Sequence, residues 1–116
     1  METSKDTDQL RALEERVASH PHNIDDVHDL ADAYAALGQW EKAIDAYSEA
    51  LTLDESNADL HNSLGIAYEE VGKPDRAIQS YQRAIELAPE DALAYHNLGA
   101  LLEDHLEGVP TVGAVG

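Results

Sequence analysis

The residues of this chain that could do chemistry are six histidines and 24 aspartates and glutamates. His20 and His22 flank Pro21, and His28 precedes Asp32 by four residues, a spacing that places both side chains on one face of a helix. Imidazole and carboxylate groups can bind a metal ion or move protons. The first set is two histidines with nothing behind them to complete a metal site, and the second has the spacing of an ordinary surface pair. We therefore interpret the first set as a solvated loop and the second as a surface pair, and expect no metal site.

The sequence also lacks catalytic motifs. It has no cysteine, which removes a thiolate nucleophile, a thiolate metal site and a disulfide framework. It contains no glycine-rich phosphate loop, no GxSxG and no HExxH. We expect a noncatalytic protein that uses no cofactor.

The overall charge limits the kinds of partner. Twenty-four acidic residues face seven lysines and arginines, for a formal net charge of −17. Such a surface repels phosphate backbones and anionic lipids, so we expect neither nucleic-acid nor membrane binding. No signal-peptide pattern follows Met1 and no apolar run of about 18 residues occurs, which predicts a cytoplasmic protein. The acidity has two interpretations: a solvated surface of the kind that halophilic proteins use, or a surface that selects a basic partner.

The elements that position these groups follow from an internal repeat. The 116 residues form one domain, and the same kinds of residue recur with a period of 34. Each unit contains a leucine followed by a small residue, and in the first two units a tyrosine comes next and alanines flank a second tyrosine. The matched sets are Leu30, Leu64 and Leu98; Ala31, Gly65 and Gly99; Tyr34 and Tyr68; Ala43 and Ala77; Tyr47 and Tyr81; Ala50 and Ala84.

The stretch from residue 58 to 91 reads ADLHNSLGIAYEEVGKPDRAIQSYQRAIELAPED and resembles a tetratricopeptide repeat (TPR). Leu64, Gly65 and Tyr68 match the Leu–Gly–x–x–Tyr element of that family, and Pro89 matches its closing proline. Residues 24–57 fill the same slots except at the end, where Glu55 replaces the proline. The large residue that opens each unit is Val27, His61 and Tyr95 rather than tryptophan.

The resemblance implies an all-α fold, a short right-handed TPR solenoid of helix–turn–helix repeats with about six helices. Asn23 and Asn57 are expected to cap first helices, Gly38 and Gly72 to end them, and Pro74 to begin a second helix. Residues 1–23 match the second helix of a repeat, and residues 92–105 match a first helix with no second helix after it. We divide the chain into residues 1–23, a TPR unit at 24–57, a TPR unit at 58–91, a closing helix at 92–105, and a glycine-rich flexible tail at 106–116.

In TPR proteins the first helices line a groove that holds a peptide or a partner helix. The resemblance implies that the groove of this chain is acidic, and that it lacks the cations with which some family members hold a C-terminal carboxylate. We therefore expect a noncatalytic protein–protein interaction scaffold that binds a peptide or partner segment, a basic one if the acidity selects it. The expected groove residues are Asp25, His28, Asp32, Asp59, Asn62, Ile66, Glu69, Glu70, Leu93, His96, Asn97 and Glu103.

The closing helix suggests an alternative function. Leu98, Leu101 and Leu102 spread around that helix, so they cannot all face the preceding pair. A second copy of the chain could cover the leucines that remain. The alternative is a structural element that self-assembles weakly through residues 92–105.

Overall fold

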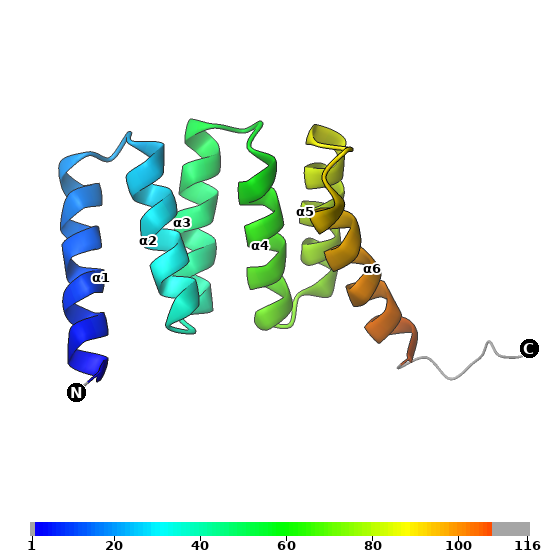
Figure 1. Cartoon of the computed structure of the whole chain (residues 1–116), viewed down its shortest axis with the longest axis horizontal. Coiled ribbons are helices and arrows are strands. Elements are labelled where there is room, and N and C mark those ends of the chain that lie inside the picture. Colours follow the sequence, from blue (N-terminus) through cyan, green and yellow to red (C-terminus); the bar gives the residue numbers. More distant parts are fainter. Residues whose placement is uncertain (1, 108–116) are drawn as a thin grey trace, which may run out of the picture.

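The computed structural model of the chain describes residues 2–107, with side chains over residues 5–104. Six helices follow one another in this range, which contains no strand, and Figure 1 shows them as a row of antiparallel neighbours. The last helix runs two residues beyond the expected end at 105, and the rest of the expected tail lies outside the described residues. The helices are α1 (Glu2–Ser19), α2 (Ile24–Ala36), α3 (Trp40–Leu53), α4 (Ala58–Glu70), α5 (Pro74–Leu87) and α6 (Ala92–Glu107).

The helix ends form where the local chemistry predicts. Asn23 and Asn57 each accept a hydrogen bond of 3.1 Å through Oδ1 from a backbone N–H in the first turn of the helix that follows. Gly38 and Gly72 adopt positive φ angles of 75° and 76° just after α2 and α4, a conformation that favours glycine. Pro74 is the first residue of α5, where its missing N–H costs no hydrogen bond. The expected caps and stops are confirmed.

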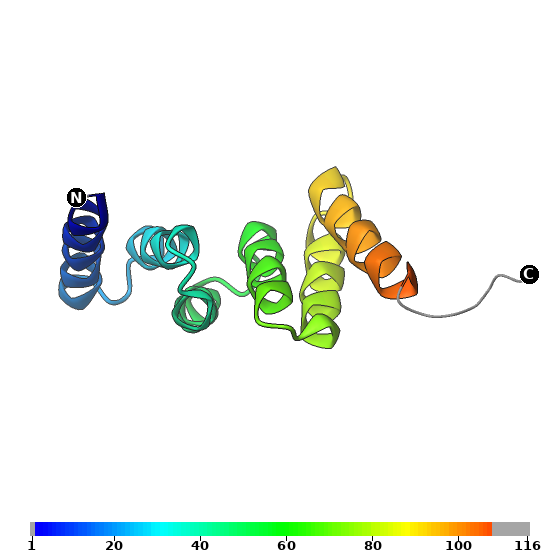
Figure 2. The ribbon, with the colours of Figure 1, turned by 90° about the horizontal axis from the view of Figure 1, so that it is seen from below.

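The helices pack as successive pairs. Helix α2 packs against α3 and α4 against α5, and each pair contacts the next through α3 with α4 and α5 with α6. Helix α1 packs against α2, so it takes the place that a preceding second helix would take. Figure 2, turned by 90°, shows the pairs following one another along the long axis. The chain therefore forms an all-α helical repeat solenoid, as the sequence predicts.

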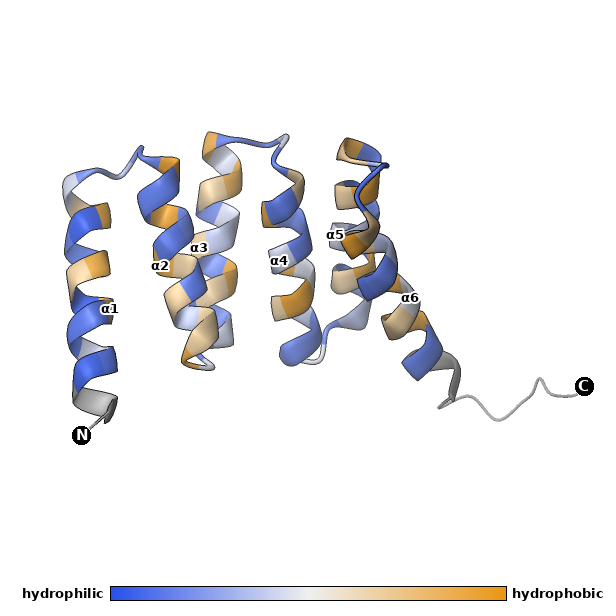
Figure 3. Cartoon of the chain, viewed as in Figure 1, coloured by the Kyte–Doolittle hydropathy of each residue, from blue (hydrophilic) through white to orange (hydrophobic). Residues whose placement is uncertain are grey.

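Small residues bring the paired helices together. Ala31, Ala43 and Ala77 have no exposed surface, and Tyr47 and Tyr81 fill the space between the helices with exposures of 3% and 0%. Figure 3 shows apolar residues alternating with polar ones along the helices. At the first helix the leucines and the valine that match the repeat also pack on this core. They are Leu10, Leu13 and Val17.

Gly65 of α4 and Tyr81 of α5 are in close contact in the core. A Cβ atom placed on Gly65 would lie 2.6 Å from Cε1 of Tyr81, closer than carbon atoms pack. The ring has little room to move aside, because Tyr81 is completely buried. Gly99 occupies the same slot one period later, and a Cβ atom there would meet nothing within 4 Å. The two glycines therefore share a position in the repeat but not an environment.

This contrast predicts opposite effects for the same substitution. Gly65→Ala should destabilise the fold by about 1–3 kcal/mol, since the new methyl group forces the buried ring of Tyr81 to shift. Gly99→Ala should stabilise it by about 0.5–1 kcal/mol, because alanine is the better helix former and has room. Urea unfolding followed by circular dichroism would measure both. Equal effects of the two substitutions would show that the Gly65–Tyr81 contact does not limit the packing.

Candidate functional site

The expected groove residues lie on the three first helices of the repeats, α2, α4 and α6. Their side chains differ in exposure, and only some are open to a ligand. Ile66 and Leu93 are exposed by 37% and 49% and supply the apolar surface. Asn62 is buried, with 6% exposure, while His28, Glu69 and Asn97 are partly buried. The exposed polar members are Asp25, Asp32, Asp59, Glu70, His96 and Glu103.

The structure brings three groups together between α2 and α3. The Tyr47 hydroxyl donates a 2.5 Å hydrogen bond to Oδ1 of Asp32, and Nε2 of His28 lies 3.7 Å from the other oxygen of that carboxylate. The imidazole of His28 also meets the ring of Tyr47 edge-on, with ring centroids 6.1 Å apart. The expected pairing of His28 with Asp32 is present. Tyr47 fixes where that carboxylate points.

A second tyrosine holds a carboxylate in the next repeat. The Tyr81 hydroxyl donates a hydrogen bond to Oε2 of Glu69, from α5 to α4. Nearby, Nδ2 of Asn97 donates a 3.0 Å hydrogen bond to Oδ1 of Asn62 and joins α6 to α4. Oδ1 of Asn62 is thus engaged within the fold, and the more exposed amide of the two belongs to Asn97.

The repeat spacing of the tyrosines gives no sign of these hydrogen bonds. Tyr34 shows the same pattern, because its hydroxyl donates a 2.6 Å hydrogen bond to Oε2 of Glu14 on α1. A buried tyrosine needs a partner for its O–H, and this rule is the signal that could have found them. Burial, the hydrogen bond to Glu14 and the charge of Glu14 raise the pKa of Tyr34 to about 12. Burial and the carboxylate partners also raise the pKa of Tyr47 and Tyr81.

Two hollows extend the candidate face at its ends. One of about 400 Å³ lies between α1 and α2 and is lined by Asp6, Gln9, Asp29 and Asp32 together with apolar side chains. The contribution of α1 was not expected, because the sequence analysis placed only first helices in the groove. The other, of about 280 Å³, lies on α6 and includes His96 and Glu103. Both lack lysine and arginine in their linings.

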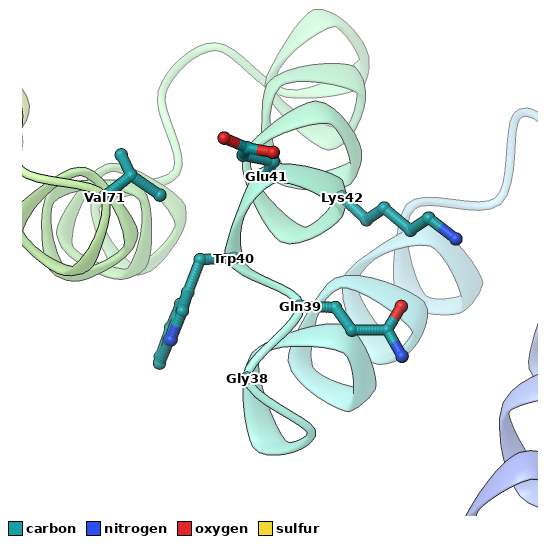
Figure 4. Close-up of a pocket in the computed structure, with 6 residues that line it drawn as sticks. All are labelled: Gly38, Gln39, Trp40, Glu41, Lys42 and Val71. Carbon is teal, nitrogen blue, oxygen red and sulfur yellow. The ribbon is translucent and has the colours of Figure 1, made fainter.

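A further hollow of about 320 Å³ lies away from these residues, where the ends of α2 and α4 meet the start of α3. Figure 4 shows the Trp40 ring on one side of it, with the side chains of Gln39 and Lys42 pointing away from that ring. No set of polar groups converges there. Across residues 5–104, no three side chains of histidine, aspartate or glutamate come together in a way that could hold a metal ion.

Models of known protein families match the repeat region of this chain. Profiles of the TPR repeat match residues 31–72, and profiles of the tetratricopeptide repeat match residues 58–91 and 80–108. The chain belongs to the tetratricopeptide repeat family. A search among curated proteins gives no match. Within the described part of this TPR chain, every helix is too short or too polar to cross a membrane.

Solved TPR structures share the fold. Two structures of MamA are 26% and 27% identical to this chain, with TM-scores of 0.80 and 0.82 over 89% and 90% of it. The chain spans 56% and 61% of those two MamA chains. The first TPR of Spaghetti (RPAP3), bound to the HSP90 peptide SRMEEVD, is 21% identical, with a TM-score of 0.81 over 90% of this chain and 83% of its own. At that identity the last likeness shows the fold alone.

The buried tyrosines make the stability of this TPR chain depend on alkaline pH. The pKa of Tyr34 is about 12 in the fold and about 10 in an unfolded chain, so the native state keeps a proton that the unfolded state loses. The stabilisation is complete below pH about 10 and is lost as the pH rises toward about 12. Urea midpoints at rising pH, with tyrosinate absorbance recorded in parallel, would measure this. Replacing Tyr34, Tyr47 and Tyr81 with phenylalanine should flatten the dependence, and an unchanged slope would assign it to other groups.

Proposed function

We propose that this TPR chain is a noncatalytic protein–protein interaction module that binds a basic peptide or partner segment along the face of α2, α4 and α6. One observation carries the proposal. The expected groove residues include six carboxylates, at Asp25, Asp32, Asp59, Glu69, Glu70 and Glu103, and neither lysine nor arginine. The RPAP3 domain bound to a peptide supports the use of this fold as a peptide receptor. A basic segment complements the charge, and steering by the acidic field would speed its association.

The carboxylates of the proposed groove divide into two groups. Asp25, Asp59, Glu70 and Glu103 form no hydrogen bond or ion pair with the described residues, so they are free to meet a lysine or an arginine. Asp32 and Glu69 are oriented by the hydroxyls of Tyr47 and Tyr81, and each keeps acceptor capacity for a ligand. Holding acceptors in place before binding reduces the entropy that binding costs.

In the proposal Asn97 contacts the peptide backbone and Asn62 positions it. The hydrogen bond from Nδ2 of Asn97 to Asn62 fixes the orientation of the Asn97 amide. Oδ1 of Asn97 is then available to accept a peptide N–H, and its second amide hydrogen is available to donate to a peptide carbonyl. An acidic C-terminal peptide is not expected on this face, since the slots at His28, Asp32, Asp59, Leu93 and Asn97 carry no permanent cation.

Charge reversal on this face tests the proposal. Asp59→Lys with Glu70→Lys should weaken a lysine-rich peptide about tenfold or more, mainly through slower association, and should reduce the salt dependence of binding. Asp45→Lys with Glu49→Lys makes the same change of net charge at exposed positions of α3 and is the matched control. Stopped-flow association of a labelled Lys-rich peptide would measure both. Tighter binding of an acidic C-terminal peptide by the unmodified chain would contradict the proposal.

A second candidate function is self-association through residues 92–105. On α6, Leu101 faces the preceding pair and is 8% exposed, whereas Leu93, Tyr95 and Leu102 are exposed by 49%, 52% and 41%. Gly99, at the slot where Gly65 receives the Tyr81 ring, has open space above it. A repeat array buries such a face against a neighbouring helix, and a second copy could supply that helix.

This candidate predicts weak association that grows with protein concentration and with salt, because like charges oppose it until they are screened. Leu102→Glu should abolish it without loss of fold, since Leu102 is exposed. Leu53→Glu, an exposed leucine on α3, is the control for the added charge. Sedimentation velocity at two salt concentrations would measure the mass. A monomer at high concentration and high salt would exclude this function and leave the groove proposal unaffected.

A further inference from the structure

A hollow of about 230 Å³ between α4 and α5 differs in charge from the rest of the molecule. His61 and Tyr68 of α4 and Arg76, Gln79, Ser80 and Arg83 of α5 line it, and its lining contains no carboxylate. Two of the seven lysines and arginines of the chain therefore meet at one small site. The size is below that of most pockets for drug-sized ligands, and it suits a single side chain or a short peptide segment.

The repeat provides an internal comparison for this charge. One period earlier, α3 has Lys42, Asp45, Ala46 and Glu49 where α5 has Arg76, Gln79, Ser80 and Arg83. One cation and two carboxylates thus become two cations and no carboxylate. The positions share the same place in the repeat, so the fold alone does not require the basic residues. The difference belongs to the second repeat and to this hollow.

The arginines and their neighbours have the arrangement of an anion site. The guanidinium of Arg76 stacks over the Tyr68 ring, with Cζ 5.9 Å from the ring centroid, and forms no ion pair with the described residues. Arg83 makes one ion pair of 3.0 Å, with Glu86, and its side chain stays 49% exposed. A guanidinium has five N–H donors, so both arginines keep donors for a ligand.

A buried hydroxyl in the same hollow has no partner. Ser80 is 7% exposed and lines the hollow, yet its side chain forms no hydrogen bond with any described residue. A buried polar group without a partner is uncommon and needs an explanation. An acceptor atom bound between Arg76 and Arg83 would satisfy it. At the rim, Nε2 of His61 donates to the carbonyl oxygen of Glu55 at 3.1 Å.

We infer that this hollow is a second binding site, which takes the carboxylate groups of an acidic peptide segment. At 3.6 residues per turn, His61 and Tyr68 lie on roughly the opposite side of α4 from Asp59, Ile66 and Glu70. The site is therefore separate from the proposed groove, and its test is independent of that proposal. A peptide with two carboxylates is favoured over a single phosphate group, because Arg76 and Arg83 stand seven residues apart and a peptide can place one carboxylate at each guanidinium.

The spacing of the arginines sets the form of the ligand. Arg76 and Arg83 stand seven residues apart on one face of α5, about 10 Å along the helix axis. In an extended peptide, glutamates two residues apart lie on the same side and about 7 Å apart. The long arginine side chains can close that difference. One carboxylate then meets each guanidinium, and Ser80 and Gln79 donate between them.

The probe for this site is the blocked peptide Ac-Gly-Glu-Gly-Glu-Gly-NH2, titrated into the whole chain at about 0.1 M salt. Screening at that ionic strength reduces repulsion from distant carboxylates more than it reduces direct contacts with the arginines. The peptide should shift the NMR signals of Arg76, Ser80 and Arg83, and the glutamine version should not. Arg76→Gln and Arg83→Gln should each weaken binding about tenfold, since each removes a charge-assisted hydrogen bond.

Matched variants separate the site from a general charge effect. Lys42→Gln makes the same charge change at the slot equivalent to Arg76 and should leave binding unchanged. Glu86→Gln should tighten binding, because it releases Arg83, whereas Glu90→Gln should not.

Ser80→Ala removes the buried hydroxyl and introduces the residue that stands one period earlier, at Ala46. It should weaken binding without loss of fold. Equal losses in Lys42→Gln and Arg76→Gln, shifts centred on other helices, or equal affinity for inorganic phosphate at the same ionic strength would each overturn the inference.

Discussion

The close approach of the two helices within each pair determines where the other helices lie. The Tyr81 ring lies directly on Gly65, and alanines such as Ala43 and Ala77 have no exposed surface because the facing helix covers them. Large side chains at these slots would separate the helices and change the angle between successive pairs. The position of every first helix, and therefore of the whole candidate face, depends on these small residues. The interior is densely packed, and a change at one pair moves all that follow it.

The tyrosines packed into that interior need hydrogen-bond acceptors, and acidic residues supply them. A buried phenol must hydrogen-bond, and the chain has carboxylates at hand for Tyr34, Tyr47 and Tyr81. Part of the strong negative charge therefore serves the fold directly. Asp25, Asp59, Glu70 and Glu103 have no such partner among the described residues, and they are the carboxylates that the proposed groove would use. A count of charges does not separate the carboxylates that bond to buried tyrosines from the rest.

The sequence predicts the fold well, since the signals that define it are local or strictly periodic. Asn57, Gly72 and Pro74 act on their own backbone, and their helix ends appear where expected. The tyrosine partners could not be found in this way, because they do not repeat. The Tyr47 hydroxyl donates to Asp32, but the residue one period after Asp32 is Ile66, which cannot accept a hydrogen bond through its side chain. The Tyr81 hydroxyl donates to Glu69 instead. The basic hollow could not be predicted from the net charge, because that sum does not show where the arginines lie.

The amide pair of Asn62 and Asn97 has a consequence for how the repeats find their order. Two full units of similar sequence could in principle stack with the wrong neighbour, a common form of misassembly in repeat proteins. The residues one period before this pair are His28 and Ser63, so the equivalent junction has different polar groups. A unit that docked in the wrong place would lose this amide–amide hydrogen bond and bring together a different pair of polar groups. The hydrogen bond between Asn97 and Asn62 is therefore a contact that forms only when α6 packs beside α4.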